Sequence, residues 1–341
     1  MMIHDNIEFH NVGALEPAVG LNGLCLARLP RALRWQLNQR ARKTGAESIG
    51  CEMRFVTDAP EIRLSLACAP PEFAATLPLR IFLGNFDLSP FQSPVLVPGQ
   101  VNTVVLTPPA EMRAAWAQGG LRPKGFAPNV WRVQCWRGTA MYCGMDCLGW
   151  PWRPPMADEK PAKTYLAYGS SITHSHLDGY PLVAARRLGV QLLNLGLSGS
   201  CHAEHEMADY MANMGSWDFA TLELGINMLG MPVETFRERV FYMVDTMTTR
   251  QPGKPIVLLT MFPFSRDLNL AVADPQNAAT HFRDVVREAA AKWRDRNVFL
   301  IEGADILDDF TGLNWDLLHP SIYGHGLMGQ NLAAKLAALL G

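Results

Sequence analysis

Residues 164–173 read TYLAYGSSIT, and this segment gives the clearest indication of the fold of the second half of the chain. Its first five residues, Thr164–Tyr168, have the length and apolar character of a buried strand, and Gly169, Ser170 and Ser171 follow directly. Further strand candidates lie at residues 191–195, 219–224, 255–260 and 298–301. Helix candidates lie at residues 181–188, 203–214, 233–250, 276–296 and 321–340. Strands and helices that alternate in this way predict an α/β fold, a parallel doubly wound sheet with helices on both faces.

The first 150 residues have a different rhythm. In Glu61–Leu66 the apolar side chains occupy alternate positions, as in a half-buried strand. Similar short runs lie at residues 51–56, 79–83, 101–107 and 129–136, separated by turns rich in proline and glycine. This pattern predicts an antiparallel all-β sandwich in which only Glu111–Gln118 is helical. Residues 151–163 are rich first in proline and then in charge, so we expect an N-terminal domain at 1–150, a linker at 151–163 and a second domain at 164–341.

Composition narrows the classes of function. The 341 residues contain 30 Lys and Arg against 32 Asp and Glu, a net charge of −2, and no long basic run. Nucleic acid and anionic membranes are therefore not expected as partners, and we expect the protein to act on a small or neutral molecule. The sequence also allows a homo-oligomer. The seven cysteines form no Cys-x-x-Cys pair, which disfavours a disulfide framework or a zinc ribbon. No signal peptide or membrane span is visible, so we expect a cytoplasmic protein.

Ligands of doubly wound sheets bind beyond the carboxyl ends of the strands. Three of the strand candidates are followed directly by segments rich in small or polar residues. These segments are 169–173, 196–200 and 225–227. Asp316-Leu317-Leu318-His319-Pro320 precedes the last helix. In a sheet of strand order 2-1-3-4-5 the first three segments would be neighbours, and the loop before the last helix would close the same edge.

Together these four segments could catalyse acyl transfer. A serine at a strand-to-helix turn lies at a helix N-terminus that favours developing negative charge, and a histidine oriented by an aspartate is the usual base for its hydroxyl. We therefore expect Ser171, His319 and Asp316 to be catalytic, with Ser171, Gly199 and Asn227 as donors of an oxyanion hole. Each residue alone also fits a helix cap, a turn or a surface loop. Their coincidence favours the catalytic interpretation.

These four segments, in this order, resemble the SGNH (GDSL-type) hydrolases, a family of esterases and acylhydrolases. The resemblance covers about residues 164–341, and its four named residues fall on Ser171, Gly199, Asn227 and His319, with Asp316 as the acid of the triad. It implies the SGNH hydrolase fold, a flavodoxin-like sheet of order 2-1-3-4-5. The string from residue 168 to 228 is most similar to a subgroup with an N-terminal β-domain, here a jelly-roll-like sandwich.

The sequence departs from the family pattern at two positions. The usual Gly-Asp-Ser reads Gly169-Ser170-Ser171, and Met228 follows Asn227 where an aspartate is frequent. Both departures affect the support of the nucleophile turn. We therefore expect them to change the rate of the reaction more than its type. They leave Ser170 as a rival nucleophile.

Two other groups of residues suggest alternatives. Histidines and carboxylates that could bind a metal flank the serine and glycine segments: His174, His176, His202, Glu204, His205 and Glu206. They lack the His-Glu-x-x-His spacing of zincins, so we predict no metal and no cofactor, and expect a pocket wall or a polar rim. Tryptophans of the N-terminal half could stack on sugar rings or pack between the domains: Trp131, Trp136, Trp150 and Trp152.

The combined prediction is a serine esterase that cleaves carboxylic esters through an acyl-enzyme on Ser171. An O-acetyl ester of a carbohydrate is the favoured substrate, by analogy with related proteins that carry an added β-domain. Two alternatives remain open: an acyltransferase that uses the same triad, and a non-catalytic glycan-binding protein.

Overall fold

The computed structural model describes residues 2–70, 72, 74–88, 94–119, 125–176, 178–268 and 278–341. The chain separates into two compact units. The first consists of Met1–Arg31 and Gly45–Ala162, and the second of Ala32–Thr44 and Lys163–Gly341. The second unit therefore includes a short segment from the N-terminal part of the sequence.

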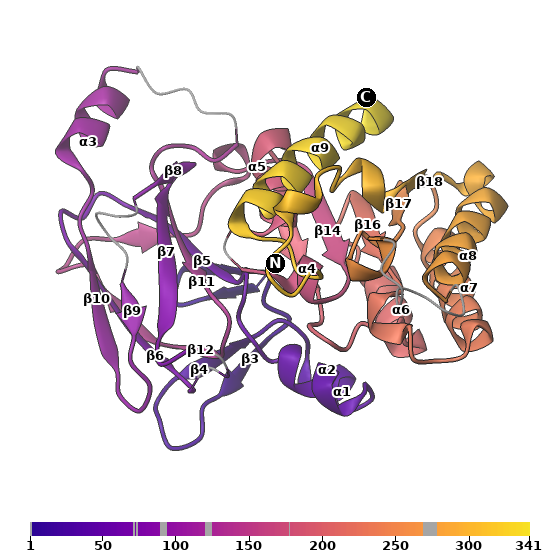
Figure 1. The fold of residues 1–341 in the computed structure, drawn as a ribbon. Coiled ribbons are helices and arrows are strands. Elements are labelled where there is room, and N and C mark those ends of the chain that lie inside the picture. Colours follow the sequence, from indigo (N-terminus) through magenta and orange to yellow (C-terminus); the bar gives the residue numbers. More distant parts are fainter. Residues whose placement is uncertain are drawn as a thin grey trace. The chain divides into compact units, whose positions relative to one another are not determined.

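The first unit contains two antiparallel sheets (Figure 1). One runs in the order β1 (Met2–His4), β2 (Ile7–His10), β5 (Glu52–Thr57), β11 (Val130–Cys135), β7 (Leu77–Leu83) and β8 (Phe86–Asp87). The short strands β13 (Trp152–Arg153) and β9 (Val95–Leu96) pair with β5 and β7. The other runs in the order β10 (Asn102–Leu106), β6 (Ile62–Cys68), β12 (Ala140–Asp146), β4 (Leu24–Ala27) and β3 (Ala14–Pro17).

Both sheets contribute to one hydrophobic core. Ile62, Leu64 and Leu66 of β6 are buried, whereas Arg63 between them is exposed, as the alternating sequence predicts. They join Met53 of β5, among others, in one buried cluster. The predicted β-sandwich is thus confirmed, and the helix expected at 111–118 is α3 (Ala110–Ala117).

Two predictions for the N-terminal half differ from the structure. The expectation of a single helix was wrong, because α1 (Arg31–Arg34) and α2 (Gln39–Thr44) are also helical. Residues 151–162, expected as a linker, pack within the first unit. There Trp152 and Arg153 pair with β5, and the buried Glu159 carboxylate accepts hydrogen bonds from Arg153 and Asn129. Residues 151–162 are thus an ordered part of the first unit although they are rich in charge, because the Glu159 carboxylate is paired with Arg153.

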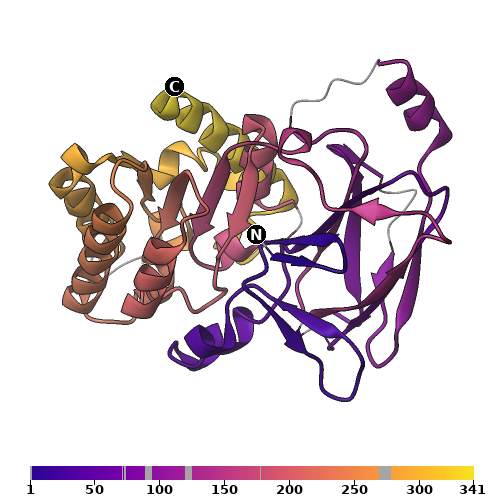
Figure 2. The same cartoon turned by 180° about the vertical axis from the view of Figure 1, so that it is seen from behind.

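The second unit contains a parallel sheet of order β15 (Gln191–Asn194), β14 (Thr164–Tyr168), β16 (Phe219–Glu223), β17 (Ile256–Leu259) and β18 (Val298–Ile301), seen from behind in Figure 2. In chain order this is 2-1-3-4-5, as predicted. The doubly wound fold places the ends of β15, β14 and β16 side by side at one edge. The segments that follow these three strands are therefore neighbours.

Helices cover both faces of this sheet (Figure 1). On one face α5 (Tyr180–Leu188) packs against α9 (Ile322–Leu340) over Tyr165, Ala167 and Val257. On the other, α6 (His205–Asn213), α7 (Val233–Arg250) and α8 (Ala278–Lys292) pack in a row. The bounds of α7 match those predicted, and Pro232 directly before Val233 accounts for where the helix begins. The first two residues of the helix expected at 276–296 lie outside the described residues. Its described part is α8, and its expected last turn is a separate 3-10 helix, Arg294–Arg296.

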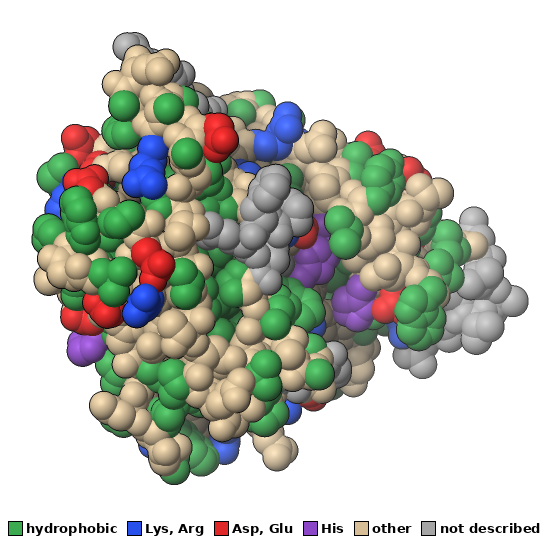
Figure 3. Space-filling model, turned by 90° about the vertical axis from the view of Figure 1, so that its left-hand side faces the viewer, with side chains coloured by type: hydrophobic (Ala, Val, Ile, Leu, Met, Phe, Trp, Pro, Cys, Tyr) green, Lys and Arg blue, Asp and Glu red, His purple; other side chains and the backbone are tan. Residues whose placement is uncertain are grey.

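The surface agrees with the near-neutral composition. On the face shown in Figure 3, Lys and Arg side chains are scattered among Asp and Glu side chains, and the described residues there form no continuous basic patch. No helix in the described ranges is long and apolar enough to cross a membrane.

Candidate active site

Ser171 begins a helix at the carboxyl end of β14. The helix α4 (Ser171–His174) has Ser170 as its N-cap, and the Ser170 hydroxyl accepts a hydrogen bond from the Ile172 N–H at 3.2 Å. Ser170 is 1% exposed, whereas Ser171 is half-buried. The two serines thus differ in their surroundings: the first caps the helix from a buried position, and the second presents its hydroxyl at the helix N-terminus.

Ser171, His319 and Asp316 are connected in series by hydrogen bonds. The Ser171 Oγ lies 2.8 Å from His319 Nε2, and His319 Nδ1 lies 2.7 Å from Asp316 Oδ2. Because a carboxylate only accepts, Nδ1 carries the proton and Nε2 is free to accept the proton of the serine hydroxyl. This is the arrangement that activates a serine as a nucleophile.

The Asp316 carboxylate is held by its own loop. Its Oδ1 accepts hydrogen bonds from the backbone N–H groups of Leu318 (3.1 Å) and His319 (3.0 Å). Partial burial would raise the pKa of Asp316, but the hydrogen bonds from the His319 ring and from both N–H groups hold that pKa below its usual value. Asp316 therefore stays ionised at neutral pH, in the state that favours a proton on Nδ1.

The loop that carries these two residues is closed at its base. Leu313 and Pro320 form an antiparallel bridge, and the Asn314 N–H donates to the His319 carbonyl at 2.7 Å. Leu317 adopts a left-handed conformation, with φ at +52°, which lets the chain reverse between Asp316 and His319. Asp316 and His319, three residues apart, are thus brought into contact by a tight turn and not by a helix.

Gly199 and Asn227 lie on the two neighbouring strand ends. Gly199 has φ of +64°, a left-handed conformation that favours glycine, and a Cβ at this position would lie 2.7 Å from Arg40 Nε, so a larger residue would also displace the Arg40 side chain. The Asn227 Oδ1 accepts a hydrogen bond from the Cys201 N–H at 3.1 Å, which leaves its amide N–H₂ as the donor. Within the described part of the chain, the N–H groups of Ser171 and Gly199 have no hydrogen-bond acceptor.

A buried carboxyl group supports the turn that carries Ser170 and Ser171. Glu223, the last residue of β16, accepts hydrogen bonds through Oε2 from the Ser170 N–H at 2.6 Å and from the Thr173 hydroxyl at 3.2 Å. A Cβ on Gly169 would lie 2.5 Å from this oxygen, so the turn closes tightly on Glu223. Burial raises the pKa of Glu223 to about 7, against the lowering effect of these hydrogen bonds. Sequence analysis missed Glu223; the available signal was a carboxylate in an otherwise apolar strand.

His325 is a second residue that sequence analysis missed. It is 3% exposed on α9, where Nδ1 accepts from the Tyr180 N–H at 3.3 Å and Nε2 lies 3.0 Å from the Ser175 Oγ. Burial, together with the nearby His176 and His319, lowers its pKa to about 3. His325 therefore stays neutral and links α9 to the segment after Ser171.

The histidines and carboxylates considered as metal ligands do not converge. His205 bonds to Glu238 at 2.7 Å, Glu204 accepts two hydrogen bonds from Asn38, and His174 is fully buried. Within the described ranges, no three His, Cys, Asp or Glu side chains are arranged to hold a metal ion. The cysteines of the described ranges form no disulfide bond with one another, and burial raises the pKa of Cys201, near Gly199, well above its usual value.

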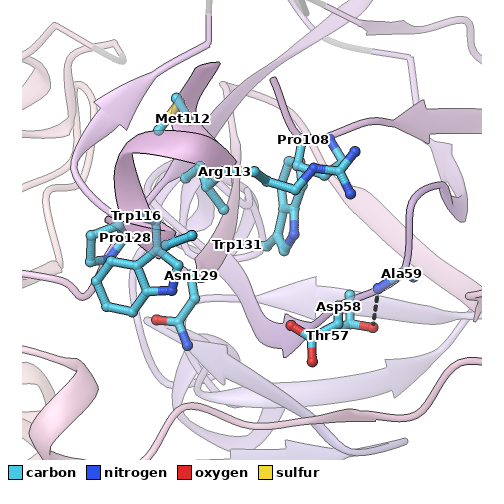
Figure 4. A pocket seen from close by; sticks show the side chains of 12 residues that line it. Thr57, Asp58, Ala59, Pro108, Met112, Arg113, Trp116, Pro128, Asn129 and Trp131 are labelled. Atoms are coloured by element: carbon cyan, nitrogen blue, oxygen red, sulfur yellow. Dashed lines mark hydrogen bonds between the residues drawn. The ribbon is translucent and has the colours of Figure 1, made fainter. Parts of the chain in front are cut away.

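The first unit contains a pocket of about 370 Å³ between α3 and the strands β5, β7 and β11 (Figure 4). Trp116 and Asn129 lie on one side, and Thr57, Asp58 and Ala59 on the other. Trp131 also lines it, although it is 1% exposed and stacks on Phe55 in the core. Of the other three tryptophans considered for stacking on sugar rings, Trp150 is exposed, while Trp136 and Trp152 are half-buried. All residues that line the pocket belong to the first unit, and none is a predicted catalytic residue.

Comparisons with known proteins agree with this fold. The salicylyl-acyltransferase SsfX3 from a tetracycline biosynthetic pathway has 18% identity and a TM-score of 0.80, with 98% of this chain and 95% of that chain covered. A family two carbohydrate esterase from Clostridium thermocellum, in complex with cellohexaose, has 15% identity and a TM-score of 0.61, over 98% and 99%. An acetyl xylan esterase (Est2A) from the rumen bacterium Butyrivibrio proteoclasticus has 12% identity and a TM-score of 0.57, over 100% and 96%.

These solved structures share the fold over nearly the whole of both chains. A search of curated proteins finds no significant match. The model of the GDSL-like lipase/acylhydrolase family matches residues 162–337, which is more than half of the chain and includes every predicted catalytic residue. The resemblance to the SGNH hydrolases is thus confirmed, and the chain belongs to the GDSL-like lipase/acylhydrolase family.

Proposed function

We propose that this protein is a serine esterase whose nucleophile is Ser171. The observation that carries the proposal is the series of hydrogen bonds from Ser171 Oγ through the His319 ring to Asp316. In the first step Ser171 Oγ attacks the ester carbonyl carbon and His319 Nε2 takes the hydroxyl proton. The protonated ring then donates this proton to the leaving alcohol, and an acyl-enzyme forms on Ser171.

Water completes the cycle. His319 removes a proton from a water molecule, whose oxygen attacks the acyl carbon. The bond between this carbon and Ser171 Oγ then breaks, the carboxylic acid leaves, and the protonated His319 ring returns its proton to Ser171 Oγ. Both steps pass through a tetrahedral oxyanion. The Ser171 N–H, the Gly199 N–H and the Asn227 amide are its proposed donors, because the two backbone groups have no acceptor among the described residues and Cys201 fixes the Asn227 carbonyl oxygen.

An O-acetyl ester of a carbohydrate is the proposed substrate. Two proteins of similar fold are named a family two carbohydrate esterase and an acetyl xylan esterase, and each is covered along nearly its full length. The near-neutral net charge of −2 also suits an uncharged substrate.

Acyl transfer to an alcohol is the second candidate function. The similar structure with a TM-score of 0.80 is named a salicylyl-acyltransferase. The same acyl-enzyme would serve, with an acceptor hydroxyl in place of water in the second step. Product analysis with and without added alcohols distinguishes the two functions, because a transferase yields a new ester while a hydrolase yields the free acid.

The test of the proposal compares two adjacent serines. Ser171→Ala should abolish release of acetate from 4-nitrophenyl acetate and from acetylated xylan, whereas Ser170→Ala should remove a helix cap and the hydrogen bond of the Ser170 hydroxyl to the buried Glu223. Loss of such a cap costs about 1 kcal/mol of stability and leaves the nucleophile in place. Turnover that survives Ser171→Ala and disappears in Ser170→Ala would overturn the assignment. A wild-type protein that binds glycans but hydrolyses neither ester would favour the non-catalytic alternative.

A further inference from the structure

A segment from the N-terminal part of the sequence belongs to the second unit. Residues Ala32–Thr44 contain α2 and part of α1, and they bury Leu33, Leu37 and Ala41, which are spaced four residues apart. We call Ala32–Thr44 the arm. The Asn38 Oδ1 caps α2 by accepting from the Ala41 N–H at 3.0 Å, so the start of this helix is fixed.

Asn38 also binds the loop that contains Gly199. Its side-chain N–H₂ donates to the Ser200 carbonyl at 3.1 Å and to Glu204 Oε1 at 2.8 Å. Its backbone N–H donates to the same Glu204 oxygen at 2.8 Å. One asparagine thus holds the loop on the C-terminal side of Gly199.

Arg40 holds the other side of the same glycine. Its Nε donates to the Ser198 carbonyl at 2.9 Å, and the guanidinium lies against the Cα of Gly199, where a Cβ would be 2.7 Å away. The Thr44 hydroxyl lies 3.2 Å from the Ser200 hydroxyl. The arm therefore contacts the residues immediately before and after Gly199 through separate hydrogen bonds.

The loop in turn holds Asn227, because the Cys201 N–H bonds to the Asn227 Oδ1 at 3.1 Å. We propose that the arm is a positioning element of the oxyanion hole, in which Asn38 and Arg40 fix the orientation of the Gly199 N–H and, through Cys201, of the Asn227 amide. This inference rests on the proposed function, and it gives a role in catalysis to residues far from the catalytic segments in sequence. Donors aimed at a developing oxyanion act only in a defined geometry, and a displacement of about 1 Å can cost on the order of 10²-fold in rate.

The variant that tests the inference is Arg40→Met. Arg40 is exposed, and methionine has a side chain about as long as the aliphatic part of arginine but lacks the Nε donor. The matched control is Arg42→Met on the same helix: Arg42 Nε donates to the Leu37 carbonyl at 3.1 Å, and its guanidinium stacks over Trp35. For Arg40→Met and Asn38→Ala we expect kcat to fall roughly 10- to 100-fold with a KM within about twofold of wild type. Arg42→Met should keep wild-type kcat, and Arg40→Lys should recover part of the loss.

A second readout does not depend on activity. Amide hydrogen exchange at residues 198–201 should accelerate in Arg40→Met and stay at the wild-type rate in Arg42→Met. Unchanged exchange together with unchanged kcat in Arg40→Met would overturn the inference, as would an equal loss of kcat in the control. If Ser171→Ala abolishes hydrolysis while Arg40→Met has no effect, the proposed function stands and this inference alone fails. If the wild type has no esterase activity but the exchange pattern is as expected, the proposed function fails and the arm still positions the loop.

Discussion

Glu223 makes the stability of this protein depend on pH in a direction opposite to most carboxyl groups. Its pKa is about 7 in the folded protein because of burial, against the usual value of 4.5 for an exposed glutamate. The folded state therefore binds more protons than the unfolded state between these two values, and the free energy of unfolding falls as pH rises through them. For these two pKa values the loss between pH 5 and pH 8 is about 2.5 kcal/mol.

Glu223→Gln removes this titration. A glutamine carbonyl can still accept from the Ser170 N–H and the Thr173 hydroxyl, so the variant resembles the protonated wild type. Urea unfolding at pH 5 and pH 8 should show the variant gaining about 2–3 kcal/mol relative to wild type over this interval. The matched control is Glu302→Gln just after β18, because the hydrogen bonds from Arg287 hold the pKa of Glu302 below its usual value and its contribution is constant above pH 5. Parallel curves for Glu223→Gln and wild type would refute the reasoning.

Three further predictions concern the chemistry. Asn227→Ala should lower kcat by roughly 10²–10³ with little change in KM, since an oxyanion donor acts mainly in the transition state; a variant that melts early but keeps wild-type kcat would remove Asn227 from the mechanism. Asp316→Asn should lower kcat by roughly 10²–10⁴, because the asparagine no longer favours a proton on His319 Nδ1, and steady-state kinetics that match wild type would contradict this. Treatment with a chelator should leave hydrolysis unchanged, whereas activity lost with chelator and restored by zinc would show that a metal is required.

Much of the second unit could be predicted because its signals are local. Apolar runs of strand length and the proline before α7 give the order of elements, and the rule for strand ends then indicates the edge where ligands bind. Asp316 and His319 were recognisable because both lie in one short loop before a helix. Their partner Ser171 lies about 150 residues away, and only the order of the four segments connected them.

The residues that sequence analysis missed act through contacts distant in the chain. Glu223 reads as the end of an apolar strand, and its role appears only when the Ser170 N–H is found against it, 53 residues away. Arg40 lies on a helix of six residues and Asn38 directly precedes it, within a part of the sequence that otherwise has strand periodicity. Leu33, Leu37 and Ala41 did carry a helical spacing, but a pattern of three positions is too short to separate from the surrounding strands.

The identity of the nucleophile is the central claim, and covalent labelling tests it most directly. A fluorophosphonate carrying an ethoxy group should react with the wild-type protein, because its phosphorus centre mimics the tetrahedral intermediate that the oxyanion donors stabilise. Peptide mass spectrometry should then locate a single adduct on Ser171, and His319→Ala should react far more slowly. An adduct on Ser170, or full esterase activity in a protein whose Ser171 is unlabelled by excess reagent, would contradict the account.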